Sequence, residues 1–162
     1  MFVYYYIHLP EPFEVVERRL LSLLSALNGM AVAAYREGEI LRTRNDGRGA
    51  EHPVVAKTVR VEVGTPLRGG SETEVPITWR ASGTPGLFRS MDAGIVVAAL
   101  GRDLTQVTLR GSYAPPLDAA GAAVDRTLLQ RFAEVSVKNF LERIAHSIEP
   151  GEDIEEAVAE RW

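Results

Sequence analysis

Residues 104–117 have the sequence LTQVTLRGSYAPPL, in which a strand pattern ends at two adjacent prolines. Apolar and polar residues alternate up to Tyr113, as in a strand with one buried face and one face in solvent. Pro115 and Pro116 lack the backbone N–H that a sheet requires, so the strand cannot continue through them. We therefore predict that the chain leaves the sheet here and starts a different element.

A long amphipathic helix is predicted after the prolines, beginning near Asp118 and ending before Pro150-Gly151. Its apolar residues recur at spacings of three and four over more than about twenty residues, which places them in one stripe. The stripe consists of Val124, Leu128, Phe132, Val135, Phe140, Ile144 and Ile148. The acidic tail 151–162 has Ile154, Val158 and Trp162 at helical spacing, which favours a short docking helix over a frayed end.

The N-terminal part predicts a strand, two helices and a second strand. Residues 2–9 are aromatic or β-branched apart from the last two, which indicates a strand. Apolar residues at helical spacing predict a helix over 12–27, with Asn28-Gly29 as its stop signal. The Ala-rich residues 30–36 favour a second short helix, and residues 39–44 a short strand.

Four further strands are predicted in the centre of the chain. Alternating patterns indicate strands over residues 55–63, 75–81 and 104–113, and an apolar run indicates another over 91–100. A turn over 64–71 and other short connections join these strands. Short connections are typical of an antiparallel meander, in which one face of the sheet is buried and the other is solvated.

The length of 162 residues predicts one domain, because typical domains hold roughly 100–200 residues. We expect this domain to span residues 1–150, followed by the tail 151–162. Hydrophobic residues at 46% and charged residues at 25% are average for a globular protein, which excludes a disordered or fibrous chain. The net charge of −4 argues against nucleic acid as a partner, since nucleic-acid binders have a basic surface.

The chain contains no cysteine, which excludes disulfides, thiolate nucleophiles and every cysteine-based metal site. The His-x-x-Glu pairs at His8 and His146 lack the second histidine of a zinc signature, so no metal is expected. The N-terminus lacks the basic region and cleavage site of a signal peptide. No apolar run approaches the roughly 18 residues that span a bilayer, so we expect no membrane insertion and a cytoplasmic location.

The predicted order of elements is a strand, a helix pair, a run of antiparallel strands and one long helix. In this order and in several local motifs, the chain resembles the START-like superfamily, also called SRPBCC. The motifs are Trp79 in ITWRASG, Leu87-Phe88 in the loop after it, the segment 109–117, and Asp125 in the long helix. The resemblance covers nearly all of residues 1–150 and is greatest to small bacterial polyketide-cyclase-like proteins.

The resemblance implies an α+β protein with the helix-grip fold. A curved antiparallel sheet would wrap around the long C-terminal helix, with a short helix pair after the first strand. It also implies a cavity between sheet and helix, because a strongly curved sheet cannot press all its inner side chains onto one helix. The predicted ligand-binding residues are Val61, Ile77, Trp79, Phe88, Leu109, Tyr113 and Phe132. Phe88, with Arg89, would gate the cavity mouth or contact a second copy.

The favoured function is binding or carriage of a hydrophobic small molecule, lipid-like or polyketide-like, by apolar burial and without a cofactor. Tyr113, His8 or Arg89 would orient the ligand. One alternative is a polyketide cyclase or dehydratase, in which His8, Tyr113 and Asp125 are the candidate acids and bases. The other alternative is an interaction protein with a filled cavity, in which the tail around Ile154, Val158 and Trp162 docks on a partner or on a second copy to form a homodimer.

Overall fold

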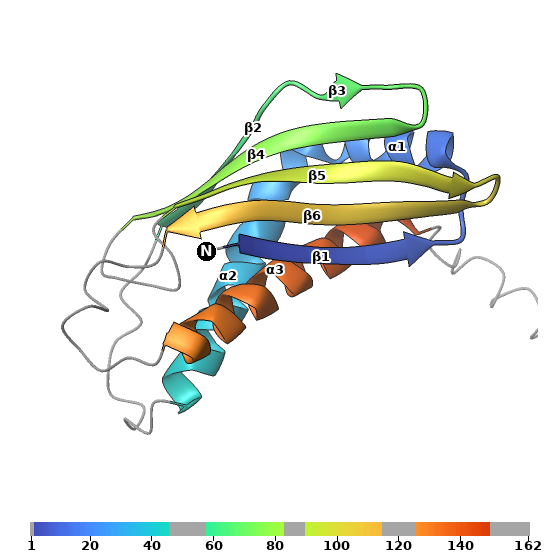
Figure 1. Ribbon diagram of the computed structural model, residues 1–162. Helices are drawn as coiled ribbons and strands as arrows, with labels where there is room; N and C mark the ends of the chain where they lie inside the picture. Colours follow the sequence, from blue (N-terminus) through green and yellow to red (C-terminus); the bar gives the residue numbers. More distant parts are fainter. Residues whose placement is uncertain (1, 46–57, 83–89, 115–125, 150–162) are drawn as a thin grey trace, which may run out of the picture.

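The computed structural model describes residues 2–45, 58–82, 90–114 and 126–149 (Figure 1). The strands in this part of the chain are β1 (Phe2–Leu9), β2 (Thr58–Val63), β3 (Leu67–Arg68), β4 (Glu72–Ser82), β5 (Ser90–Gly101) and β6 (Leu104–Ala114). They form one antiparallel sheet in the order β1-β6-β5-β4-β2, with β3 also paired to β4. The first strand therefore joins the sheet beside the last one.

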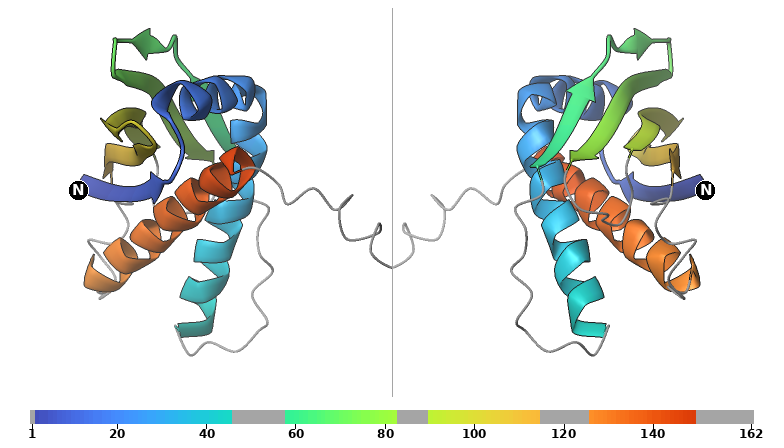
Figure 2. Two further views of the ribbon diagram at one scale, coloured as in Figure 1. Left: turned by 90° about the vertical axis from the view of Figure 1, so that its right-hand side faces the viewer. Right: turned by 90° about the vertical axis from the view of Figure 1, so that its left-hand side faces the viewer.

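The helices pack on one face of the sheet, which curves around them (Figure 2). They are α1 (Phe13–Ser22), the short 3-10 helix η1 (Leu24–Ala26), α2 (Leu27–Asn45) and α3 (Arg126–Ile148). The long C-terminal helix α3 packs against α2 and under β1 and β6. A curved, unclosed antiparallel sheet around a C-terminal helix is the helix-grip fold, so the predicted α+β class and architecture are confirmed.

Two adjacent rows of side chains cross the concave face of the sheet and differ in size. One row is made of large residues, each directly opposite the next: Tyr113, Met91, Trp79 and Val61. In the adjacent row, Gly111 lies opposite Ala93. A Cβ at Gly111 would lie 2.5 Å from the Cβ of Ala93 and 2.7 Å from the carbonyl oxygen of Asp92. Only glycine fits where β5 and β6 approach in this way.

On the convex face, an ion pair covers another glycine. Arg110 donates to Glu74 at 3.0 Å, between Nη2 and Oε2. Gly94 is directly opposite Arg110, and the Glu74 side chain lies where a Cβ at Gly94 would be placed. The absence of a side chain at Gly94 thus leaves room for an ion pair between β4 and β6.

A buried carboxylate ties α1 to the β3–β4 hairpin. Glu17 is 7% exposed and accepts hydrogen bonds from Arg68 Nε and Nη2, both at 2.9 Å, and from Thr73 Oγ1 at 2.7 Å. The Arg68 hydrogen bond, followed by that of Thr73, lowers the pKa of the Glu17 carboxyl against the opposing effect of burial. The sequence predicted only a turn over 64–71, so β3 and this contact were missed.

Two predictions in the helical region are wrong. The first helix ends at Ser22, and Asn28-Gly29 lies inside α2 instead of ending a helix. The strand predicted over 39–44 is also helical, because α2 continues to Asn45. Tertiary contacts override the local stop signal here: Asn28 Oδ1 accepts the N–H of Val61 in β2 at 2.8 Å.

The other predicted elements are confirmed wherever the structure describes them. β1, β4, β5, β6 and α3 occur within a few residues of their expected positions, and β2 begins at Thr58. The predicted helix start over 118–125 and the tail 151–162 lie outside the described residues. In the part of the chain that is described, no helix combines the length and the apolar character needed to span a bilayer.

Candidate functional site

The predicted ligand-binding residues that the structure describes lie together on the concave face of the sheet. They are Val61, Ile77, Trp79, Leu109 and Tyr113, all between 0% and 7% exposed. Phe132 is in α3, but its side chain is outside the described residues, as are Phe88, Arg89 and Asp125 altogether. The alternation of residues along each strand thus predicted which side chains face the helices.

Trp79 is the centre of this layer. Its ring packs edge-on against Phe140 of α3, with centroids 5.2 Å apart and planes at 71°. The ring centroid of Tyr35 in α2 is 6.2 Å from that of Trp79. Aromatic pairs with this geometry are favourable beyond their area burial. Sheet, α2 and α3 are therefore in direct side-chain contact at Trp79.

A groove of about 390 Å³ opens between β1 and the N-terminal half of α3. Its apolar lining is supplied by Val3 and Tyr5 of β1 and by Val135 and Val137 of α3. Its polar lining consists of Tyr4, Arg131, Glu134 and Lys138. The groove follows the edge of the sheet where the last helix runs beneath it, and none of the predicted ligand-binding residues is among those that line it.

The helix α3 is held unevenly along its length. Large side chains bury its C-terminal half: Phe140, Leu141, Ile144 and Ile148, each fully buried. Arg19 of α1 also donates from Nη1 to the carbonyl oxygen of Ile148 at 2.7 Å, which fixes that end. In the N-terminal half the described buried residues are smaller, namely Ala133, Ser136 and Val137. Figure 1 shows this half of α3 diverging from β1, which leaves the groove between them.

Tyr113 lies on the buried face and is influenced electrostatically by a residue of the groove. Burial raises the pKa of the Tyr113 hydroxyl, and the negative charge of Glu134 raises it further. Glu134 itself lines the groove. The Tyr113 hydroxyl is therefore neutral over the whole physiological pH range, which makes it a hydrogen-bond donor and an ineffective base at neutral pH.

Ser136 was missed by the sequence reasoning. Its hydroxyl is fully buried, and no hydrogen-bond partner for it is found among the described residues. Ser136 precedes Phe140 by four residues, so the two side chains share one face of α3. A polar residue in an otherwise apolar stripe is the sequence signal that would have identified it.

The structure answers which face of the first strand points inward. Val3 and Leu9 are buried, whereas His8 is exposed on the convex face, where Nε2 lies 3.1 Å from Gln106 Oε1. His8 is thus separated by the sheet from Tyr113. Within the described ranges, no three His, Cys, Asp or Glu side chains gather as metal ligands would.

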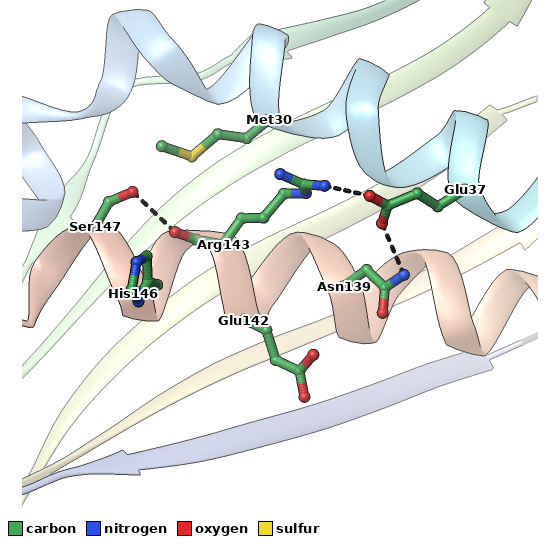
Figure 3. A pocket seen from close by; sticks show the side chains of 7 residues that line it. All are labelled: Met30, Glu37, Asn139, Glu142, Arg143, His146 and Ser147. Atoms are coloured by element: carbon green, nitrogen blue, oxygen red, sulfur yellow. Dashed lines mark hydrogen bonds and ion pairs between the residues drawn. The ribbon is translucent and has the colours of Figure 1, made fainter.

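A second groove, of about 480 Å³, lies between α2 and α3 (Figure 3). It is open and polar, and an ion pair between Glu37 and Arg143 crosses it, with Asn139 Nδ2 donating to Glu37 at 2.9 Å. His146 and Ser147 also line it. None of the predicted ligand-binding residues contributes to this groove.

No protein-family model matches the chain, and no curated protein matches it. Among solved structures, a conserved protein from Geobacillus kaustophilus is similar, with 16% identity, a TM-score of 0.51, and 91% of this chain and 95% of that chain covered. A protein from Thermus thermophilus has 18% identity and a TM-score of 0.46, covering 91% and 97%. The Zhui aromatase/cyclase from Streptomyces sp. R1128 has 14% identity and a TM-score of 0.42, covering 92% and 93%.

The protein has the helix-grip fold, which is the fold implied by the resemblance to the START-like superfamily. Strand order, antiparallel pairing and the position of α3 all agree with the resemblance drawn from the sequence, which is confirmed at the level of the fold. A fold of this kind does not by itself specify an activity, because function depends on the residues of the site.

Proposed function

We propose that this protein binds or carries a hydrophobic small molecule, lipid-like or polyketide-like, between the concave face of the sheet and the N-terminal half of α3. One observation carries the proposal: a groove of about 390 Å³ runs between β1 and α3 beside the apolar face that includes Tyr113. Binding sites of small molecules are concave and mainly apolar, with a few polar groups that fix orientation.

The apolar wall supplies most of the binding free energy in this proposal. Val3, Val135 and Val137 would contact the ligand at the groove. The residues predicted from the sequence stay a prediction, because none of those that the structure describes lines the groove: Val61, Ile77, Trp79, Phe88, Leu109, Tyr113 and Phe132. Burial contributes about 25 cal/mol for each Å² of apolar surface removed from water, so about 200 Å² of ligand surface contributes about 5 kcal/mol.

Two hydroxyls would orient the ligand. Tyr113 is neutral and can donate a hydrogen bond, and the buried Ser136 hydroxyl, which has no partner among the described residues, would bond a ligand oxygen or nitrogen that reaches it. Neither group is a base at neutral pH, and His8 lies on the other side of the sheet. We therefore favour carriage over cyclisation or dehydration, and the proposal includes no cofactor and a cytoplasmic setting.

The test is thermal unfolding against fatty acids, sterols, quinones and aromatic polyketides, after native mass spectrometry of the purified protein. A binding ligand raises the melting temperature with its concentration; at about 100 times its dissociation constant the stabilisation is about 2.7 kcal/mol. Val135→Trp, which fills the groove, should abolish the shift. Ser147→Trp, in the groove between α2 and α3, is the matched control and should keep it.

Ser136→Ala separates binding from folding. Removing a buried hydroxyl that has no partner among the described residues should leave the unliganded protein as stable or more stable. The same variant should weaken a ligand with a polar group several-fold, while a purely hydrocarbon ligand is unaffected. A clean apo mass without any shift from the panel would overturn the proposal, as would a shift that Val135→Trp leaves unchanged.

A further inference from the structure

The two edges of the sheet differ in how they are covered. At the β2 edge, α2 packs alongside and Asn28 Oδ1 accepts the outward N–H of Val61 at 2.8 Å. At the β1 edge, no hydrogen bond to the backbone beyond the pairing with β6 is found in the described part of the chain. The outward N–H and C=O groups of β1 are therefore open to another strand.

The sequence of β1 lacks the features with which proteins protect an open edge. Residues 2–9 contain no Lys, Arg, Asp, Glu or Pro. Their register with β6 runs without a bulge from Phe2 opposite Ser112 to Leu9 opposite Thr105. An edge strand of this kind is a template for pairing with a second chain.

Exposed aromatic rings follow the same strand on the convex face. Phe2, Tyr4 and Tyr6 are 62%, 53% and 50% exposed, and they are half of the large hydrophobic residues exposed in the described ranges. The rings of Tyr4 and Tyr6 have centroids 6.0 Å apart, and those of Tyr6 and His8 5.2 Å. A continuous exposed row of aromatic side chains is typical of an interaction surface.

We propose that β1 pairs antiparallel with β1 of a second copy of this chain, around a two-fold axis at Tyr5. Residues directly opposite in such a pair face the same side, so an exposed residue must meet an exposed residue. With the axis at Tyr5, Tyr4 lies opposite the partner's Tyr6, and Phe2 opposite the partner's His8. This register pairs all four aromatic side chains, whereas an axis at Tyr6 leaves Phe2 unpaired.

The charged side chains beside Tyr5 are complementary to those of a second copy that is related by this two-fold axis. Tyr5 Oη donates to Glu142 Oε1 at 3.4 Å, and Lys138 Nζ lies 3.6 Å from the same oxygen. Each copy thus has one cation, Lys138, and one anion, Glu142, beside the axis. In the second copy the two-fold axis places this cation and anion in the opposite order. One pair of strands buries less than the roughly 2,000–5,000 Å² of an obligate dimer, so we expect the association to depend on concentration.

Sedimentation equilibrium of the full chain over a range of concentrations tests the association. The wild type should dimerise as its concentration rises. The double variant Tyr4→Lys/Tyr6→Lys places like charges opposite each other at the axis and should remain monomeric. Leu67→Lys is the matched control, because Leu67 is 62% exposed but belongs to β3, and it should dimerise like the wild type. A monomeric wild type, or a dimer that the double variant retains, overturns the proposal.

Cross-linking tests the register, since the natural chain has no cysteine. Residues opposite each other in antiparallel strands have Cα atoms about 4.5–5.5 Å apart, which suits a disulfide. A mixture of Tyr4→Cys and Tyr6→Cys proteins should form disulfide-linked dimers several-fold more efficiently than either variant alone. Both side chains are half exposed, so folding should be preserved, and circular dichroism checks it. Equal cross-linking of the single variants contradicts pairing around Tyr5.

Discussion

Gly111 and Gly94 illustrate at the residue scale why two glycines in one sheet are not equivalent. A methyl group at Gly111 would meet the backbone of β5, including the Asp92 carbonyl oxygen at 2.7 Å, and the backbone cannot move aside cheaply. A methyl group at Gly94 would meet the Glu74 side chain, which can rotate away at the expense of its ion pair with Arg110.

We therefore expect Gly111→Ala to lower the free energy of unfolding by about 1–3 kcal/mol or more, as overpacked sites do. Gly94→Ala should cost less than about 1 kcal/mol, because exposed ion pairs contribute little. Urea denaturation of the two variants measures the difference between their free energies of unfolding. The chemical change is the same in both, and both lie in the same region of the sheet. Equal losses would show that β5 and β6 can separate at Gly111 without strain.

At the scale of elements, the Glu17 carboxylate links α1 with the β3–β4 hairpin. Because its pKa is lower in the folded than in the unfolded protein, ionised Glu17 stabilises the fold above the unfolded pKa of about 4.3. This stabilisation is lost as the pH falls through the folded pKa. Glu17→Gln should cost about 1 kcal/mol at pH 7, since Arg68 is largely exposed and its charge is screened.

Denaturant unfolding of wild type and Glu17→Gln between about pH 7 and pH 3 measures this contribution, because that range spans the unfolded pKa. The two curves should be separated at neutral pH and converge in acid. Glu14→Gln is the control on the exposed side of the same helix, and it should shift stability by only a few tenths of a kcal/mol. A constant separation at all pH values would mean that the loss arises from packing and not from ionisation.

The elements also show how far a sequence pattern can predict a fold. β4, β6 and α3 have regular patterns of apolar residues, so they were predicted close to their true bounds. α2 was divided incorrectly into a short helix over 30–36 and a strand over 39–44. Asn28 and Gly29, interpreted as a stop signal, lie in its first turn, where Asn28 Oδ1 accepts the N–H of Val61. β1 is apolar on both faces, so its orientation is decided by pairing with β6.

The candidate site was likewise predicted only in part from the sequence. Alternation along β4 and β6 correctly predicted that Trp79 and Tyr113 face the helices. The groove depends on the angle at which α3 passes β1, and that angle results from contacts far apart in the sequence. Ser136 could be noticed in the sequence as a polar residue within the apolar stripe, but only the structure shows that its hydroxyl is fully buried.

At the scale of the whole molecule, the uneven attachment of α3 predicts uneven hydrogen exchange. Amides of residues 140–148 lie in the half with large buried side chains, and their exchange should require nearly global unfolding. Amides of residues 131–137 should exchange sooner, by local opening, and a bound ligand should slow them. Hydrogen exchange followed by mass spectrometry measures both halves, and uniform protection along α3 would contradict the prediction.

If the protein is the carrier that we propose, the hydrogen bond from Arg19 to the carbonyl oxygen of Ile148 affects how fast a ligand exchanges. It secures the far end of α3 to α1, so the near end can separate from β1 while the core around Trp79 stays intact. Loading and release of a cargo would then be limited by a local opening rate, which is faster than global unfolding. A carrier built in this way can be very stable and still exchange its cargo rapidly.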